Sequence, residues 1–372
     1  MVFYLLLQSN ILHPLASLEW QECSSLPTSM LHPQAALLAG RVYLGGGVTS
    51  GMGMAEDAYV YIYDIKNNAW GGLHTPTYHY AVAAYQSQLV LLGGVEISTH
   101  DVTNQVWILG EECTWIQPLP PMLTKCRGST AISVDHNLIV AGGHDDFALD
   151  VVQVYDGNQW GSWNNQILPQ ASYWMKSSLH EGHWYLAGGR WLNKNVFHTS
   201  LKSLISNSHD GETLTCIWQS LPDVPHGHSS PCSLGTELVA VGGEGSSVVH
   251  AYSCHRKSWV PVGNTPVGCD SGYTISLSPG ELLLVTVEDT SGLVSRTFRG
   301  TVKCKPAREL ATHLTSIIIC HWKGLCRCKE VQMNLSYFSD QAHYELLSVL
   351  ENRLTFQCVY QIYGGLGFIL FI

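Results

Sequence analysis

The stretch Leu138-Ile139-Val140-Ala141-Gly142-Gly143 decides the fold of this chain, because close copies of it recur at regular intervals. Each copy is a short apolar run that ends in two glycines. The five pairs are Gly45-Gly46, Gly93-Gly94, Gly142-Gly143, Gly188-Gly189 and Gly242-Gly243, and successive pairs begin 46 to 54 residues apart. A nearly constant period of this length is typical of proteins built from one repeated supersecondary unit.

Other features keep the same phase as the glycine pairs. Each pair is followed by a turn-rich stretch, an aromatic strand such as residues 152–156, and then one isolated tryptophan. The tryptophans are Trp70, Trp115, Trp160, Trp218 and Trp259. A stretch of small residues, for example 128–133, then starts the next period. Each period therefore holds about four short strands. Four-stranded units at this spacing predict an all-β chain, a β-propeller.

These residues carry a resemblance to a known family. The double glycine, the tyrosine-containing strand after it and the spaced tryptophan resemble the Kelch repeat over residues 18–304. The resemblance implies four-stranded blades. Glycine has no Cβ, so a ring or a neighbouring backbone can approach closely, and the tryptophan can fill the space between adjacent blades. We expect both residue types to be structural.

The two ends of the repeat predict how it closes. A sixth unit is degenerate, because Thr286 and Val287 stand where a glycine pair is expected and no tryptophan follows. At the N-terminal end, Trp20 lies 50 residues before Trp70 without a glycine pair before it. We therefore predict a six-bladed propeller whose last blade is completed by an N-terminal strand at residues 18–23, which would cover open sheet edges.

The remaining segments do not repeat. We predict a short N-terminal segment at 1–17, the propeller at 18–304, and a C-terminal extension at 305–372 that is partly helical or disordered. Within the extension, residues 339–354 have the spacing of an amphipathic helix. The cysteines and histidine at 320–328 match no common zinc motif, so we predict no metal site. An insertion at 203–211 is expected to form a surface loop.

Composition and charge limit the possible functions. The 372 residues are 45% hydrophobic and 13% charged, and the net charge is −10. No apolar run approaches the ~18 residues of a membrane-spanning helix. An acidic chain disfavours nucleic-acid partners, which bind clustered lysine and arginine. Most of the twelve cysteines stand alone in the sequence, which favours reduced thiols and a cytoplasmic location.

Two sets of loops are candidates for a binding face. In Kelch propellers of the ligase-adaptor type, the resemblance implies a binding face made by the loops after the glycine pairs and the loops that lead into each next blade. Aromatic side chains there supply large contact areas, and arginines can hold carboxylates. The candidate partner-binding residues are Tyr78, Tyr80, Arg127, Asp145, Asp146, Tyr173, Trp174, Arg190, Trp191, Asn193, His228 and Glu244.

We predict a non-catalytic protein-interaction scaffold that binds a protein or peptide, without a cofactor. The carboxylates in the candidate loops disfavour a strongly acidic partner. The resemblance implies substrate recognition in a ubiquitin ligase or a cytoskeletal contact such as actin. Ligase relatives carry a BTB domain before the propeller, which residues 1–17 do not encode; another subunit supplies it, the chain is a fragment, or the role differs.

Two alternatives stay open. The sequence contains no Gly-x-Ser-x-Gly elbow, His-Glu-x-x-His pair or phosphate-binding Gly-Lys-Ser/Thr loop, yet some propellers are oxidases or glycan-active enzymes, which makes an enzyme at the channel mouth the main rival. An extracellular adhesion module is the other alternative. It would require a secretory signal, and the apolar N-terminus lacks the basic residues that such a signal begins with.

Overall fold

The computed structural model describes residues 17–49, 58–162, 167–190, 200–207, 214–253, 256–288, 294–303, 356–362 and 365–371. The chain divides into two compact units, Met1–Lys303 and Cys304–Ile372. The described residues are almost entirely strands and turns, apart from one 3-10 turn at Glu111–Cys113. No helix among them is long and apolar enough to cross a membrane.

The first unit is built from four-stranded antiparallel sheets, which we number in chain order. Sheet 1 contains β3 (Gln34–Leu38), β4 (Arg41–Gly45), β6 (Tyr59–Asp64) and β7 (Ala69–His74). Sheet 2 contains β9 (Ala81–Tyr85), β10 (Gln88–Leu92), β12 (Val106–Leu109) and β13 (Trp115–Ile116). Sheet 3 contains β14 (Thr130–Val134), β15 (Asn137–Ala141), β16 (Val152–Tyr155) and β17 (Trp160–Ser162).

The remaining sheets follow the same order. Sheet 4 contains β18 (Lys176–His180), β19 (His183–Ala187), β20 (Ser200–Asn207) and β21 (Leu214–Leu221). Sheet 5 contains β22 (Ser230–Leu234), β23 (Glu237–Val241), β24 (Ser246–Ser253) and β25 (Ser258–Cys269). Sheet 6 contains β26 (Tyr273–Ser278), β27 (Glu281–Glu288), β28 (Val294–Lys303) and β1 (Ser17–Cys23). Two short ribbons pair β2 (Met30–Leu31) with β5 (Val48–Thr49), and β8 (Thr77–Tyr78) with β11 (Val95–Glu96).

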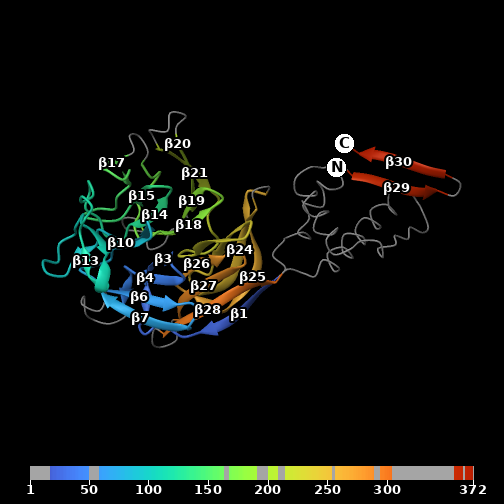
Figure 1. Cartoon of the computed structure of the whole chain (residues 1–372). Helices are drawn as coiled ribbons and strands as arrows, with labels where there is room; N and C mark the ends of the chain where they lie inside the picture. Colours follow the sequence, from blue (N-terminus) through green and yellow to red (C-terminus); the bar gives the residue numbers. More distant parts are fainter. Residues whose placement is uncertain are drawn as a thin grey trace. The chain divides into compact units, whose positions relative to one another are not determined.

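The first strands of the sheets lie together in the interior of this unit. Contacts join β3 to β9, β9 to β14, β14 to β18, β18 to β22, β22 to β26, and β26 back to β3. Figure 1 shows β3, β14, β18 and β26 towards the middle, with β7, β13 and β1 at the periphery. The arrangement is propeller-like, as the repeat predicted.

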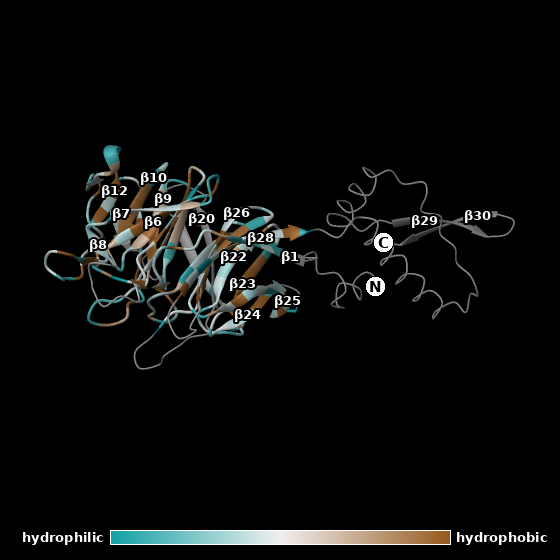
Figure 2. Cartoon of the chain, turned by 90° about the horizontal axis from the view of Figure 1, so that it is seen from below, coloured by the Kyte–Doolittle hydropathy of each residue, from teal (hydrophilic) through white to brown (hydrophobic). Residues whose placement is uncertain are grey.

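Burial follows the position of each strand within its sheet. In β10, Leu89, Val90, Leu91 and Leu92 are all buried, because sheets pack on both of its faces. The outer strand β7 is largely exposed. Hydrophobic residues accordingly concentrate along the inner strands (Figure 2). At roughly 25 cal/mol per Å² of buried apolar area, packing between sheets is the main source of stability.

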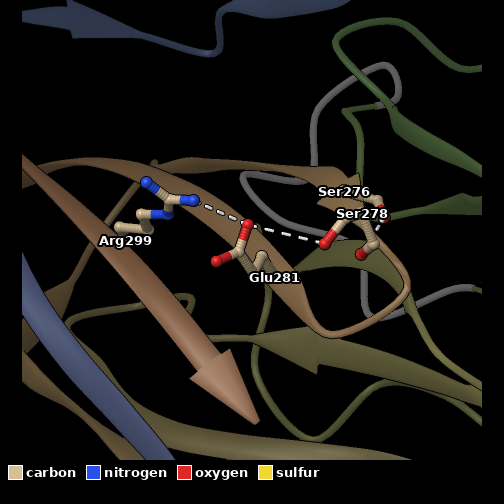
Figure 3. A network of polar contacts seen from close by, with 4 residues as sticks. All are labelled: Ser276, Ser278, Glu281 and Arg299. Carbon is tan, nitrogen blue, oxygen red and sulfur yellow. Dashed lines mark hydrogen bonds and ion pairs between the residues drawn. The ribbon is translucent and has the colours of Figure 1, made fainter. Parts of the chain in front are cut away.

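Sheet 6 combines strands from both ends of the repeat. Strands β26, β27 and β28 come from the degenerate sixth unit, and β1 pairs with β28 so that Trp20 lies opposite Gly300. A Cβ at Gly300 would lie 2.8 Å from the Trp20 ring, so glycine leaves room for the indole. Across β27 and β28, Arg299 donates to Glu281 at 2.7 Å, beside Ser278 (Figure 3).

Three of the glycine pairs join their sheet to the next through a backbone hydrogen bond. The N–H groups of Gly94 and Gly143 donate to the carbonyls of Cys126 and Ser172 at 2.8 Å, and Gly243 donates to Cys269 at 2.9 Å. Each acceptor precedes the first strand of the following sheet. The left-handed φ angles of these glycines, between 97° and 105°, are ones that other residues rarely adopt.

One glycine assignment was wrong. Gly45 is the last residue of β4 and pairs with Gln34, which places it where Leu92 stands in β10. The pair equivalent to Gly93-Gly94 is therefore Gly46-Gly47. Position 45 requires glycine for a different reason: a Cβ there would lie 2.0 Å from the Tyr80 hydroxyl oxygen.

The repeated tryptophans link the outer strands. The indole N–H of Trp70, Trp115, Trp160 and Trp259 donates to a carbonyl that follows the tryptophan of the preceding sheet: those of Ser24, His74, Pro120 and Pro222 respectively. Trp20 takes the same role for sheet 6, with Asn264 as acceptor at 2.8 Å. Among the described residues, the Trp218 Nε1 has no hydrogen-bond partner.

Two other expectations need correction. The insertion expected to be a loop is strand as far as Asn207, because β20 pairs with β21 over eight residues, while residues 208–213 lie outside the described part. In the second unit, the described residues form a hairpin of β29 (Phe356–Ile362) and β30 (Gly365–Phe371), which the sequence did not indicate. The helix expected at 339–354 and the cysteines and histidine at 320–328 lie outside the described residues.

Candidate functional site

A set of tight turns lies at the end of the sheets where the first strands begin. The residue two positions before the first strand has left-handed backbone in sheets 1 to 5; these residues are His32, His79, Gly128, Trp174 and His228, with φ between 53° and 62°. A single non-glycine residue in this region costs of order 1–3 kcal/mol, which the surrounding structure must offset. Ser271 is the equivalent residue before sheet 6.

Hydrogen bonds connect neighbouring turns and offset that cost. The Gly128 N–H donates to the His79 carbonyl and the Trp174 N–H donates to the Gly128 carbonyl, both at 2.7 Å. Between sheets 6 and 1, the His32 N–H donates to the Ser271 hydroxyl at 3.0 Å. The same hydroxyl lies 2.9 Å from His32 Nδ1. The turns therefore hold their side chains in defined positions relative to one another.

Several of these side chains form one aromatic and basic cluster. The His32 ring stacks on Trp174 at a centroid distance of 4.8 Å and lies 4.7 Å from the His228 ring. The Arg190 guanidinium lies over Trp174, 5.2 Å from the ring centroid. Tyr173 contacts Trp174 edge-on at 5.1 Å. Sheets 1, 4 and 5 thus contribute to a single group of side chains.

A cavity of about 510 Å³ lies beside this cluster. It is lined by Leu31, His32, Arg190, His228, Glu244, Asp270 and Ser271. Protein cavities of roughly 300–1,000 Å³ are large enough for a small ligand. The same volume can hold one or two side chains of a partner. The lining combines a cation, two carboxylates, two imidazoles and a hydroxyl.

Basic groups at the base of the site are desolvated. Lys176 is 1% exposed, and its ammonium donates to the His228 carbonyl. Burial lowers the pKa of Lys176 to about 7, against the opposing effects of Cys269 and Asp270. Burial, reinforced by His228, Lys176 and Arg190, lowers the pKa of His32 to about 2. His32 is therefore a neutral imidazole at physiological pH.

Buried polar side chains continue below the turns. Gln34 donates to the Met175 carbonyl at 2.8 Å, Thr130 and Ser177 share a hydrogen bond of 2.8 Å, and Tyr273 donates to the Ser177 carbonyl at 3.2 Å. These bonds join first strands from four sheets. They satisfy polar groups that would otherwise be costly to bury, and they give the site a fixed base.

A second cluster adjoins the first at sheet 3. Arg127 and His144 pair through their backbones, and the Arg127 guanidinium lies 3.5 Å from His144 Nδ1. The His144 ring contacts Tyr173 at 5.0 Å. Lys125 and Asp145 form an ion pair, with 3.2 Å between Nζ and Oδ2. Tyr173 thus connects this cluster to Trp174.

The structure brings most of the predicted binding residues to this end of the sheets. Arg190, His228 and Glu244 line the cavity, Tyr173 and Trp174 flank it, Arg127 and Asp145 belong to the second cluster, and Asp146 is exposed beside it. Trp191 and Asn193 lie outside the described residues.

Two predicted binding residues are structural instead. Tyr80 is fully buried, and its hydroxyl donates to the Tyr59 carbonyl at 2.7 Å while its ring covers the glycines of sheet 1. Tyr78 is 5% exposed and pairs with Val95 in a ribbon. Neither offers a surface to a partner, so we remove both from the candidate site.

The binding residues predicted from the sequence do not include four of the lining residues: Leu31, His32, Asp270 and Ser271. A signal for His32 existed, since it precedes the first strand of its sheet by the same two residues as His79, Trp174 and His228. No glycine pair precedes this turn, so the repeat motif alone does not mark it.

The cavity also bears on metal binding. Among the described residues, no group of three histidine, cysteine, aspartate or glutamate side chains is arranged to hold a metal ion. The lining presents polar and ionic groups to the cavity.

The comparisons with known proteins inform the fold only. The chain matches no protein-family model, and no curated protein matches it. It is similar to the solved structure of YjhT, with a TM-score of 0.58 and 14% identity over 74% of this chain and 95% of that one. At this identity the likeness extends to the architecture and not to the activity.

Proposed function

We propose that the first unit is a six-bladed Kelch-type β-propeller whose sixth blade is completed by β1. The cyclic contacts of the first strands support this proposal. The indole hydrogen bonds support it as well, since the bond from Trp20 to Asn264 occupies the place that the other tryptophans fill between their sheets. Such closure leaves no sheet edge open.

We further propose that this propeller is a non-catalytic scaffold that binds a peptide segment of a partner protein at the cavity. The observation that carries the proposal is the convergence of turns from sheets 1, 4, 5 and 6 on one cavity of about 510 Å³. The His32–Trp174 stack beside charged side chains resembles the centre of a protein interface. Buried aromatic and arginine residues dominate affinity in such centres.

The proposal includes a cellular setting. Cys126, Cys232 and Cys269 are buried and free of disulfides, which supports a reducing compartment such as the cytoplasm. In that setting, we propose that the propeller selects a substrate for a ubiquitin-ligase complex or anchors a cytoskeletal protein such as actin. In either role, the peptide segment that the cavity binds would determine which partner protein is recruited.

The test is a selection from a random 12-residue peptide library displayed on phage, with the full chain as bait. Enriched peptides are synthesised, and their dissociation constants are measured by fluorescence polarisation. The Leu31→Trp substitution fills the cavity without changing its charge. It is expected to weaken binding at least tenfold.

The matched control is Leu179→Trp. Leu179 is 42% exposed near the turn between β18 and β19, at the opposite end of the sheets. This substitution is expected to change affinity less than twofold. Denaturation of both variants verifies that they fold. Failure to enrich any peptide, or equal effects of the two substitutions, would refute the proposed function.

A further inference from the structure

Charged side chains of opposite sign come to the cavity from different sheets. Arg190 comes from sheet 4, whereas Asp270 precedes sheet 6 and Glu244 follows the second strand of sheet 5. Within the described part of the chain, neither Arg190 nor Asp270 forms an ion pair. The Arg190 Nε is buried without a hydrogen-bond partner there. A buried donor in that condition is costly unless a ligand satisfies it.

The opposite charges are therefore presented separately to whatever enters. The guanidinium is held over Trp174 by its cation–π contact and by the backbone pairing of Arg190 with Tyr173. Asp270 is anchored by its N–H, which bonds to the Val287 carbonyl, and by the adjoining Ser271, whose hydroxyl bonds to His32. Both charges thus stand on rigid turns from different sheets, which fixes the spacing that a ligand must match.

Resting on the proposed function, we infer that the recognised peptide carries one acidic and one basic side chain close together, with the acidic group at Arg190 and the basic group at Asp270 and Glu244. A guanidinium binds a carboxylate through two parallel hydrogen bonds, and two carboxylates are a suitable site for an ammonium or guanidinium group.

A segment of one charge sign fits this lining less well. A purely acidic segment would approach Glu244 and Asp270, and the whole chain carries a net charge of −10. A purely basic segment would leave the buried nitrogen of Arg190 unsatisfied. Only a segment with both signs satisfies the two sides of the cavity, which is specificity through penalties on alternative ligands.

The test uses the peptide enriched on the wild-type chain and two charge-removing variants of the protein, Arg190→Gln and Asp270→Asn. The peptide is synthesised in parallel with its acidic residue changed to the amide and its basic residue changed to glutamine. We expect each protein variant to bind the unmodified peptide with an affinity at least tenfold lower than wild type. Arg41→Gln serves as a control, because Arg41 is an exposed arginine at the opposite end of the sheets.

The pairing of charges is tested by combining these changes. For the peptide that lacks its acidic residue, Arg190→Gln should change the affinity less than twofold. For the peptide that lacks its basic residue, Asp270→Asn should likewise change the affinity less than twofold. Folding of each variant is verified by its unfolding midpoint.

The outcomes separate this inference from the proposed function. Enriched peptides that lose affinity with Leu31→Trp but are indifferent to Arg190→Gln and Asp270→Asn overturn the inference and leave the peptide-binding function intact. Enriched peptides of a single charge sign do the same. Peptides indifferent to Leu31→Trp contradict the proposed function itself.

Discussion

The glycine pairs and the turns before the first strands lie at the same end of the sheets, yet the chain treats them differently. Both positions of the pair are glycine in sheets 2 to 5. In sheets 2, 3 and 5, the N–H of the second glycine donates a hydrogen bond to a carbonyl just before the first strand of the next sheet. The turns keep the same left-handed backbone in sheets 1 to 5 but present His32, His79, Gly128, Trp174 and His228. One region repeats its chemistry, and the other repeats only its geometry.

The difference separates framework from recognition. A backbone that must approach another backbone closely allows only glycine, so the side chain is fixed by the fold. A turn whose side chain points to a cavity can vary without loss of the fold, and specific binding can develop there. The predictions below test this division.

The largest effect is expected for the framework. Gly142→Ala would place a Cβ 2.3 Å from the Ser172 carbonyl oxygen, at φ +63°. The backbone would have to shift, and we expect a loss of about 3 kcal/mol or more in the free energy of unfolding. Gly40→Ala is the control, since φ is +73° there but no atom lies within 4 Å. It should cost only about 1–2 kcal/mol. Equal losses in urea denaturation would show that close approach is unimportant.

The next effect concerns Lys176, which lies beneath the turns. Its pKa is about 7 in the folded chain and 10.5 in the unfolded chain, so the unfolded state binds more protons between these pH values. Wild-type stability therefore gains up to about 1.4 kcal/mol per pH unit from this group as pH rises from 7 to 10.5.

Lys176→Met removes that dependence. The stability of the variant relative to wild type should be greatest at pH 6 and should fall steadily towards pH 10, as measured by urea denaturation at each pH. A difference that stays constant over this range would mean that Lys176 is not desolvated in the folded state.

A smaller effect is expected for the N-terminal strand β1. Trp20→Phe removes the indole bond to Asn264, whereas Trp218→Phe removes a nitrogen without a partner among the described residues. We expect Trp20→Phe to cost about 1 kcal/mol more than Trp218→Phe. A thermal-denaturation series of the two variants measures this difference. If Trp218→Phe is the more damaging, the Trp20–Asn264 bond does not contribute to the stability of the first unit as expected.

The smallest effect is expected at the cavity rim. Glu244 is exposed and lines the cavity. Glu244→Gln should leave the free energy of unfolding within about 0.5 kcal/mol of wild type, while it weakens the binding of selected peptides. A loss of stability well above that value would place Glu244 in the framework and contradict the division drawn here.

Features that recur in the sequence were predicted well. The pairing of the N-terminal strand with the degenerate sixth unit followed from the tryptophan spacing, because each repeat must bury the same faces. The glycine pair of sheet 1 was misplaced by one residue. Three consecutive glycines at 45–47 offer two alignments, and only the pairing of Gly45 with Gln34 distinguishes them.

The sequence by itself determined that four-stranded units repeat, since periodic burial and turn chemistry are local properties of the chain. Only the tertiary structure decided which loop residues face a partner: it buried Tyr78 and Tyr80 and added His32 and Ser271 to the cavity. Contacts between turns that lie far apart in the chain set these side-chain positions, and no local pattern encodes such distances.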